Sequence, residues 1–255
     1  MSDALAGRRV VITRPAGQAQ RLAALVREAG GEPLLFPAIE IAAALDPQPL
    51  DDAIARLDTF DLAIFISPSA VEKAMTRITA RRTLPAKLRC AAIGPGGARA
   101  LARFGVREVI VPDGRYDSES LLASTFMQHV HGKHVVIFRG DGGRELLANT
   151  LTARGAQVAA VTCYRRTQPR LDITPLMQAW AQCSVAALIV TSSEGLQNLC
   201  AMIGSAGEAH LRETPVVVPH ARIAARARAM GIKQVIESAS GDEALMKTVI
   251  QHVCS

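Results

Sequence analysis

One strand–turn–helix pattern occurs twice in this chain and limits the folds open to it. The first copy is DLAIFISPSAVEKAM, residues 61–75, and the second is VAALIVTSSEGLQNL, residues 185–199. Each begins with an apolar run of strand length, passes through serines, and continues with apolar residues at helical spacing. Ser192 follows Ser67 by 125 positions, which is close to half of the 255 residues. The chain is therefore expected to contain two copies of one α/β design.

The first copy predicts a strand from Leu62 to Ser67, which Pro68 ends because proline has no N–H for the sheet. Ser69 precedes Glu72 by three positions, the spacing of a capping box, and this predicts a helix that opens at Ser69. Ligands of α/β sheets bind at the edge where strands end and helices begin. A serine in this turn could act as a nucleophile, but with no base beside it the turn is better interpreted as one wall of a binding cleft.

Other apolar runs continue the pattern along the chain. Strands are expected at 9–13, 33–36, 90–93, 109–111, 134–138, 158–164, 185–190, 216–218 and 234–236, with helices between most of them and Ser118 as the cap of one helix. The proline-rich segment 37–49 and the stretch 164–169 are expected to be extended connections. Strands that alternate with helices predict parallel sheets with right-handed crossovers.

A longer internal repeat supports duplication. RRVVITRPAGQAQRLAALVREAGG aligns with KHVVIFRGDGGRELLANTLTARGA, which places Arg14 opposite Arg139, and ALARFGVREVIVP is similar to ARARAMGIKQVIE. All βαβ units look alike, so similarity of pattern alone is weak. Several turns keep their register over the whole length, however, and this favours a true duplication.

Composition excludes several classes of protein. The charge of +6 is spread over single arginines and aromatics are only 4%, which disfavours nucleic acid and leaves either a solvated mixed surface or an acidic ligand. No apolar run approaches the roughly 18 residues of a membrane span, and the first ten residues lack the apolar region of a secretory signal. Five cysteines without a C-x-x-C pair indicate a reducing compartment, so a cytoplasmic protein without a zinc site is expected.

The turns at the strand ends are the strongest collective candidate for a site. They are Arg14-Pro15, Ser67-Pro68-Ser69, Gly94 to Gly97, Arg139 to Gly143 with Gly140, Thr191-Ser192-Ser193, and Pro219-His220. Each would offer free backbone N–H groups at a helix N-terminus, worth roughly 0.3–1 kcal/mol to an anion. For any single turn an ordinary cap is the alternative, but six turns facing one cleft would suit a polyanion. No turn matches a nucleotide motif, because Arg99 stands where G-x-G-x-x-G needs its third glycine.

Two other features have competing interpretations. His129, His131 and His134 have the spacing of metal ligands, but they precede a strand at the opposite edge, so exposed loop histidines are favoured. Tyr164 ends a strand where the second connection starts. It is either a residue at the core edge or hinge, or a phenol between two domains that donates a proton, with a reference pKa near 10.

These residues together resemble the uroporphyrinogen-III synthase family over nearly the whole chain. The matching stretches are VVITRPAGQAQRLAALVREAGGEPLLFPAIEI, DLAIFISPSAVEKAM, AAIGPGGARALARFG, VVIFRGDGGRELLANTLTARGAQVAAVTCYRRT and IVTSSEGLQNL. The resemblance depends on their order and spacing, since each short motif is weak by itself.

The resemblance implies an α/β fold of two flavodoxin-like parallel-sheet domains joined by a two-stranded linker. The first domain would comprise 1–37 and 171–255, the second 50–163, and the linker strands 38–49 and 164–170. The sequence repeat and the spatial domains would then not coincide.

The resemblance also implies a lyase of haem (porphyrin) biosynthesis. It would cyclise hydroxymethylbilane, a linear polycarboxylate tetrapyrrole, with loss of water and inversion of ring D, without metal or organic cofactor. A monomer is expected because the sequence has no long apolar stripe left over. By position Tyr164 corresponds to the tyrosine that helps the hydroxyl depart. Ser67, Ser192 and the turn from Gly94 to Gly97 correspond to positions that face the substrate, although some members have threonine at the place of Gly97.

Charge and repeat symmetry add Arg14 and Arg139 to the expected binding residues. The strand-end turns add Ser69, Gly140, Ser193 and His220. The alternative from another class is a non-catalytic two-domain binding protein for an acidic metabolite, which would share the fold and the turns.

Overall fold

The structure is a computed structural model that describes residues 4–142 and 145–253. The chain divides into two compact units. Unit 1 comprises Met1–Glu40 and Thr167–Ser255, and unit 2 comprises Ile41–Arg166. The second unit is therefore inserted into the sequence of the first.

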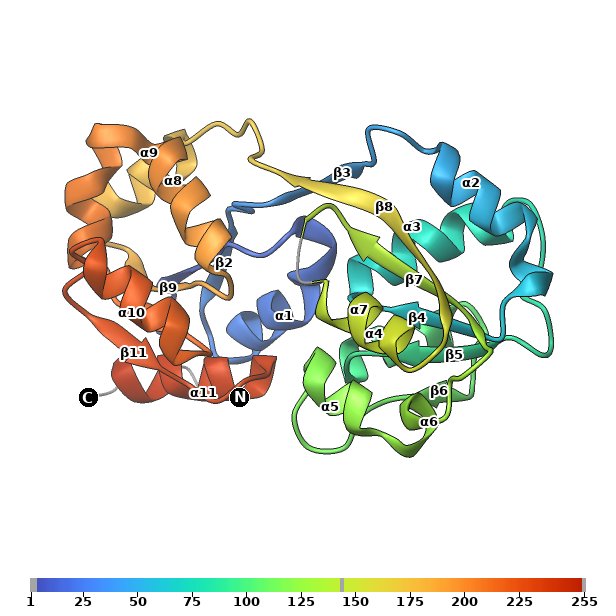
Figure 1. Cartoon of the computed structure of the whole chain (residues 1–255). Coiled ribbons are helices and arrows are strands. Elements are labelled where there is room, and N and C mark those ends of the chain that lie inside the picture. The colour runs from blue at the N-terminus through green and yellow to red at the C-terminus, as the bar shows by residue number, and fades with distance from the viewer. Residues whose placement is uncertain (1–3, 143–144, 254–255) are drawn as a thin grey trace. The chain divides into compact units, whose positions relative to one another are not determined.

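Unit 1 contains a five-stranded sheet of short strands, of which the three central ones are mostly buried. Its order is β11–β10–β9–β1–β2 and its pairs are parallel. The strands are β1 (Arg9–Ile12), β2 (Glu32–Leu35), β9 (Val185–Ile189), β10 (Val216–Val218) and β11 (Val235–Glu237). Because β1 pairs with both β2 and β9, the blue N-terminal strands lie in one sheet with the orange and red C-terminal segments (Figure 1).

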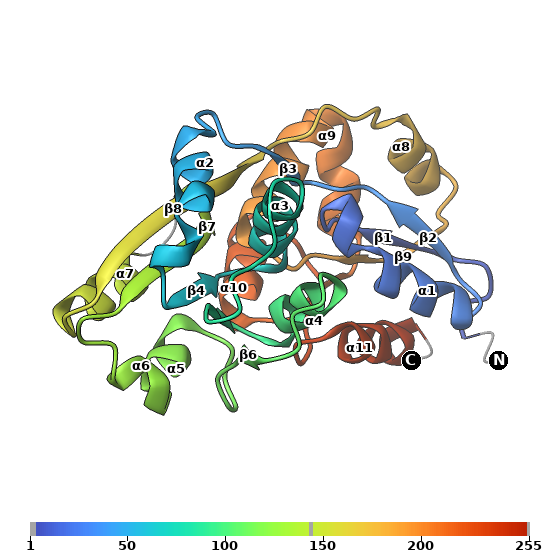
Figure 2. The same ribbon diagram turned by 90° about the vertical axis from the view of Figure 1, so that its right-hand side faces the viewer.

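Helices cover both faces of this sheet (Figure 2). They are η1 (Ala16–Gln18), α1 (Gln20–Glu28), α8 (Thr174–Ala181), α9 (Ser193–Glu213), α10 (Ala221–Ala229) and α11 (Asp242–Val253). Val10 and Ile12 of β1 pack with α1 and α11, whereas Val11 packs with α8, α9 and α10. Successive side chains of a strand point to opposite faces, so the apolar run of β1 supplies both layers of core.

Unit 2 contains a six-stranded sheet of order β3–β8–β7–β4–β5–β6. The strands are β3 (Glu40–Ala43), β4 (Leu62–Phe65), β5 (Arg89–Ala92), β6 (Val109–Ile110), β7 (His134–Gly140) and β8 (Gln157–Thr167). From β8 to β6 every pair is parallel. The carboxyl ends of these strands therefore meet at one edge of the sheet.

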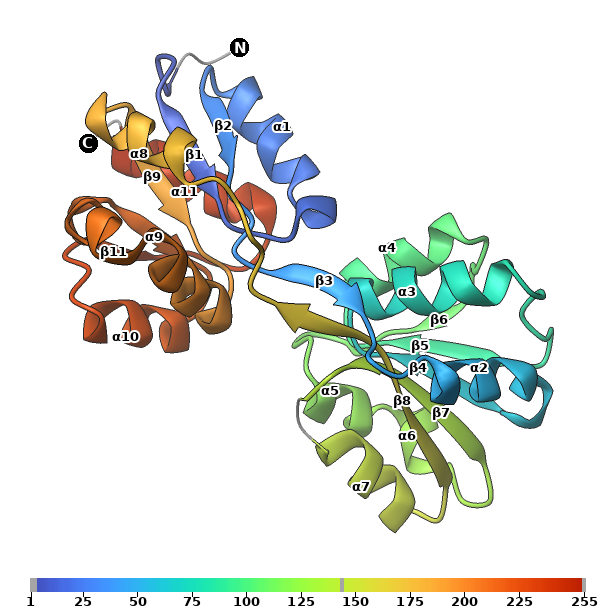
Figure 3. The same cartoon turned by 90° about the horizontal axis from the view of Figure 1, so that it is seen from above.

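Two helical layers enclose the second sheet (Figure 3). The helices are α2 (Gln48–Ala55), η2 (Leu57–Thr59), α3 (Pro68–Thr79), α4 (Pro95–Arg103), α5 (Ser118–Ala123), α6 (Thr125–Gln128) and α7 (Leu146–Ala153). Phe65 of β4 packs with α2, α3 and α4, and Ile64 packs with α5, α6 and α7. The fold is thus two three-layered α/β units, as expected.

The two sheets share one spatial order. Strands β7 and β8 occupy in unit 2 the places that β1 and β2 occupy in unit 1, and β4, β5 and β6 occupy the places of β9, β10 and β11. Ser67 after β4 and Ser192 after β9 are therefore equivalent positions, as are Arg14 after β1 and Arg139 near the end of β7. Each half of the sequence contributes strands to both units.

Two predicted caps were wrong by one or two residues. The N-cap of α3 is Ser67, whose hydroxyl accepts a hydrogen bond from the N–H of Ala70, and not Ser69 in a capping box with Glu72. Pro68 is the reason, because it takes a place in the first turn, where its missing N–H costs nothing. The N-cap of α5 is Asp117 and not Ser118, since its carboxylate accepts from the N–H of Ser120.

The first expected connection, residues 37–49, was only partly extended. It contains β3, the edge strand beside β8, and the first turn of α2. Helix α8 also had no counterpart in the prediction. Among the described residues no helix combines the length and the apolar character that a bilayer span requires.

Candidate functional site

The carboxyl edge of the unit 2 sheet gathers most of the predicted site residues. Ser67 follows β4, the turn from Gly94 to Gly97 follows β5, Gly140 ends β7, and Tyr164 lies in β8. Their strands are neighbours in the order β8–β7–β4–β5, so the sheet places these residues side by side. Gly143 of the predicted Arg139 to Gly143 turn lies outside the described residues.

A hydroxyl pair joins two of these strands. The Oγ of Ser67 lies 3.0 Å from the Oη of Tyr164, within hydrogen-bond distance. The same Oγ accepts the N–H of Ala70 at 3.1 Å and so caps α3. Both residues were predicted site residues, but the sequence did not predict a hydrogen bond between them.

Tyr164 is buried, with 1% of its surface exposed, and packs in the core between the sheet and α2, α3 and α4. A register shift after Arg139 places Gly140 opposite Tyr164. A β-carbon at Gly140 would lie 2.7 Å from Cζ and 3.0 Å from Oη of this ring. Gly140 thus leaves space for the phenol, a role that differs from the expected contact with a ligand.

The glycine turn is also tightly packed. A β-carbon at Gly97 would lie 3.0 Å from the Cβ of Ala92, and one at Gly96 would lie 3.3 Å from Pro68. Glycine at these places lets α4 lie close to β5 and to α3. Ser69, in the first turn of α3, is 7% exposed and buried.

Tyr116 is a residue at this edge that sequence analysis did not select. The residue is 58% exposed, and a β-carbon at Gly94 would lie 3.0 Å from the Cβ of Tyr116. An exposed aromatic ring beside a helix N-terminus can stack on a flat ligand while backbone N–H groups bind its anionic substituents. Its position in a loop after β6 gave no periodic signal in the sequence.

The carboxyl edge of the unit 1 sheet carries the remaining predicted residues. Ser192 caps α9, accepting the N–H of Gly195 at 3.1 Å, the same bond that Ser67 makes in unit 2. The neighbouring Ser193 Oγ is buried and has no hydrogen-bond partner among the described residues. His220 is the N-cap residue of α10 and is exposed.

Both expected anion-binding arginines already have carboxylate partners. The Arg14 Nη1 lies 2.5 Å from the Oδ1 of Asp242, and both side chains are 18% exposed. The Arg139 Nη1 lies 2.7 Å from the Oε1 of Glu145, and its Nη2 donates to the carbonyl of Gly142. A ligand carboxylate would therefore have to share or displace these partners.

Three histidines with metal-like spacing stay apart from this edge. His129 and His131 are exposed, while His134 begins β7 and places its Nδ1 3.0 Å from the carbonyl oxygen of Thr59. Within the described parts of the chain, no group of three His, Cys, Asp or Glu side chains could hold a metal ion.

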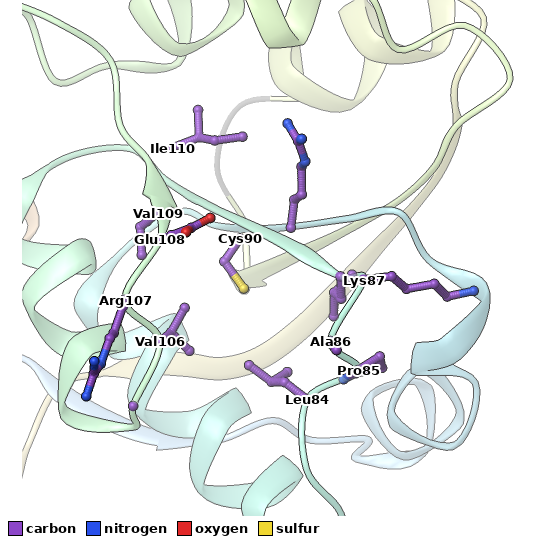
Figure 4. Close-up of a pocket in the computed structure, with 13 residues that line it drawn as sticks. Leu84, Pro85, Ala86, Lys87, Cys90, Val106, Arg107, Glu108, Val109 and Ile110 are labelled. Carbon is purple, nitrogen blue, oxygen red and sulfur yellow. The ribbon is translucent and has the colours of Figure 1, made fainter.

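A hollow of about 900 Å³ lies at the opposite edge of the unit 2 sheet, where β5 and β6 begin (Figure 4). Lys87 and Arg107 extend away from its centre, and the Cys90 sulfur lies among apolar side chains. Burial raises the pKa of the Cys90 thiol to about 11, which keeps it protonated and unreactive at neutral pH. This hollow therefore lacks the converging polar groups of the carboxyl edge.

Comparison with known proteins identifies the family of this chain. The family model described as "Uroporphyrinogen-III synthase HemD" matches residues 20–247. Uroporphyrinogen-III synthase from Salmonella typhimurium is 34% identical over 94% of this chain and 99% of its own length, and the Escherichia coli enzyme is 32% identical over the same shares.

Solved structures support the fold. The uroporphyrinogen-III synthetase of Helicobacter pylori has a TM-score of 0.61 at 14% identity, covering 96% of this chain and 99% of that one. A mutant Thermus thermophilus uroporphyrinogen III synthase has a TM-score of 0.58 at 21% identity, covering 97% and 99%. With a model match over most of its length and relatives above 30% identity, the chain belongs to the uroporphyrinogen-III synthase family, enzymes of haem biosynthesis.

Proposed function

We propose that this chain closes hydroxymethylbilane to uroporphyrinogen III, with loss of water and inversion of ring D. The observation that carries the proposal is the match of residues 20–247 to the family model, together with serine-capped helices at the carboxyl edges of both sheets. The bilane is a polycarboxylate, and helix N-termini are favourable places for carboxylates.

The backbone N–H groups of α3, α4, α9 and α10, with Ser67, Ser192 and Ser193, are proposed to bind the carboxylates of the substrate. His220 and the arginines Arg14 and Arg139 would add charge at the same edges. Binding of this kind selects the geometry of the chain before ring closure, and orientation is a large source of rate enhancement. Tyr164 is proposed to assist departure of the hydroxyl group.

An isomer-resolved assay tests this function. Purified protein is mixed with freshly prepared hydroxymethylbilane, and the oxidised products are separated by chromatography. We expect uroporphyrin III in excess, whereas heat-denatured protein should give the I isomer that forms spontaneously. Formation of the I isomer alone, with tight binding of an unrelated organic acid, would overturn the proposal in favour of a non-catalytic binding protein.

The protein is further proposed to act in the cytoplasm as a monomer, without cofactor and without nucleic acid. Large exposed apolar side chains among the described residues are scattered singly, at Leu35, Leu45, Tyr116 and Leu171, which gives no broad apolar face for a second copy. Sedimentation equilibrium should return the mass of one chain, 27.1 kDa. A dimer mass at micromolar concentration would contradict the monomer.

A further inference from the structure

The Tyr164 hydroxyl belongs to a buried side chain and has one hydrogen-bond partner among the described residues. A phenol O–H inside a core must place its hydrogen on an acceptor, because an unpaired buried polar group is strongly unfavourable. Among the described residues, the Oγ of Ser67, at 3.0 Å, is the partner of this hydroxyl. The distance allows either oxygen to donate, and we infer from the burial of the phenol that its hydrogen is directed to Ser67.

This donation fixes the direction in which the serine hydroxyl acts. Ser67 Oγ already accepts the N–H of Ala70 at 3.1 Å, so the bond from Tyr164 fills its second acceptor position. The hydrogen of the serine is then left to donate elsewhere. Ser67 is only partly buried and stands at the strand end, whereas Tyr164 is 1% exposed. Ser67 is therefore the more exposed of the two residues that carry these hydroxyls.

The backbone around the pair holds the phenol in place. Gly140 lies against the hydroxyl end of the ring, with space for no side chain. The N–H of Asp141 donates to the carbonyl of Tyr164 at 2.8 Å, and the carboxylate of Asp141 accepts the N–H of Arg166 at 3.0 Å. The ring thus has a fixed position from which its hydroxyl reaches Ser67.

We propose that Ser67 is the catalytic group that donates to the departing hydroxyl of the bilane, and that Tyr164 is a positioning residue that acts through Ser67. The inference rests on the proposed function, and it moves the contact with substrate from the buried phenol to the serine. A hydroxyl that accepts a hydrogen bond becomes a stronger donor, so the phenol polarises the serine.

The step conserves atoms and charge. As the C–O bond of the hydroxymethyl group breaks, the oxygen keeps the electron pair, takes the Ser67 proton and leaves as water, while Ser67 takes the phenol proton. The positive charge left on the bilane balances the negative charge of the Tyr164 phenolate. Ring closure releases a proton from the attacking pyrrole carbon, and this proton returns through Ser67 to the phenolate.

A double-mutant cycle on the full-length protein tests the relay. Ser67→Gly removes the hydroxyl but keeps an acceptable N-cap residue. We expect it to lower kcat about 10²-fold, the scale for loss of one donor to a reacting oxygen, with KM nearly unchanged. Tyr164→Phe should lower kcat by about tenfold in the original protein and by less than twofold in the Ser67→Gly background. An equal effect of Tyr164→Phe in both backgrounds would overturn the relay.

Ser192→Gly provides the matched control because Ser192 makes the same cap on α9 and, among the described residues, has no hydrogen bond to a tyrosine. The double variant Ser192→Gly/Tyr164→Phe should lower kcat by the product of the two single-variant effects. If the two effects overlap as in the Ser67 cycle, the coupling is not specific to the hydroxyl pair and the proposal fails.

A spectroscopic measurement separates the relay from the proposed function. The chain has two tyrosines, so incorporation of ¹³Cζ-tyrosine gives two resonances, and Tyr116→Phe assigns them. Ser67→Gly should shift the Tyr164 resonance and leave that of Tyr116 in place, whether or not the protein forms uroporphyrinogen III. An unmoved Tyr164 resonance would overturn the hydrogen bond, whereas a shifted resonance in a protein that yields only the I isomer would overturn the proposed function and the catalytic role that rests on it.

Discussion

Gly140 shows how the absence of a side chain can fix the position of a functional group, the phenol of Tyr164. Its φ lies outside the left-handed region, so the backbone itself does not require glycine there. Glycine is required for steric reasons, because a β-carbon at position 140 would lie only 2.7 Å from the Cζ of Tyr164. Gly140 therefore leaves room for the Tyr164 phenol beside the end of β7.

We predict that Gly140→Ala moves the Tyr164 ring away from Ser67. Overpacking of a core costs about 1–3 kcal/mol, so the free energy of unfolding should fall by that amount and kcat should fall with it. Urea unfolding and the isomer assay measure the two effects. Gly17→Ala is the control, because a β-carbon there meets nothing within 4 Å and φ is not left-handed. Unchanged kcat in Gly140→Ala would contradict the role of the ring position.

Tyr116 gives a second prediction at the scale of a residue. If its exposed ring stacks on a pyrrole of the substrate, Tyr116→Ala should raise KM several-fold, since an aromatic pair contributes about 0.5–1.5 kcal/mol beyond area burial. Tyr116→Phe keeps the ring and should keep KM. Initial-rate kinetics on both variants measure the difference, and an equal rise in KM for both would show that the ring face is not what binds.

At the scale of elements, the sequence predicts strands better than helix starts. Buried parallel strands such as β4 and β7 are continuous apolar runs, which are easy to find. Helices α2 and α8 were missed because each follows a segment interpreted as an extended connection, whereas α3 and α4, which also have proline in the first turn, directly follow predicted strands. Proline indicates a break in a strand and is equally suited to a helix start, so proline-rich segments are ambiguous without tertiary contacts.

The candidate site was predictable only in part for a related reason. Ser67 and Tyr164 were selected separately, from a turn and from a family resemblance. Their hydrogen bond depends on the order β8–β7–β4 and on the register shift at Gly140, which are properties of the assembled sheet. The ion pair of Arg14 with Asp242 likewise joins two segments that the repeat alone does not bring together.

One carboxylate links two elements of unit 2 and predicts a dependence on pH. Asp51 of α2 accepts hydrogen bonds from Arg77 in the last turn of α3 and from Arg81 just after that helix, and these bonds hold the pKa of its carboxyl well below the usual range. A carboxylate with a lowered folded pKa adds stability above its unfolded pKa of 3.8, and that contribution is lost as pH falls below it.

Asp51→Asn should therefore lower the urea midpoint at pH 7, and the difference from the original protein should narrow between pH 4 and pH 2. Asp52→Asn, at the next position of α2, is the control and should have a smaller effect at pH 7, because the Asp52 carboxylate accepts a hydrogen bond from the uncharged amide of Gln48. Urea titrations at several pH values measure both. A gap that stays constant down to pH 2 would contradict the ion pair as its source.

At the scale of the whole molecule, each half of the sequence provides strands for both units. Unit 1 takes β1 and β2 from the first half and β9, β10 and β11 from the second, and unit 2 takes the complementary set. Such an exchange between the halves of a duplicated chain accounts for equivalent serines that lie in different units. The boundaries 37/38, 49/50, 163/164 and 170/171 stay a prediction from the sequence.

A cut just after the chain returns to unit 1 tests how that unit is held together. Residues 168–173 have no regular structure, and Leu171 is 40% exposed, so a site for a specific protease can be inserted after Arg170. We expect the cleaved pieces to remain associated, because β1 and β9 pair within one sheet. Size-exclusion chromatography with and without urea measures this. Separate elution without urea would contradict the shared sheet.

The insertion of unit 2 into unit 1 also has a consequence during synthesis on the ribosome. Strand β1 leaves the exit tunnel first, but its neighbour β9 begins only at Val185. At about 5–20 residues per second, β1 waits roughly ten to thirty seconds with one edge unpaired, while unit 2 is already complete. Nascent chains stalled between these points would expose the Val10–Ile12 edge to other polypeptides, so slow translation should make this protein depend more on chaperones.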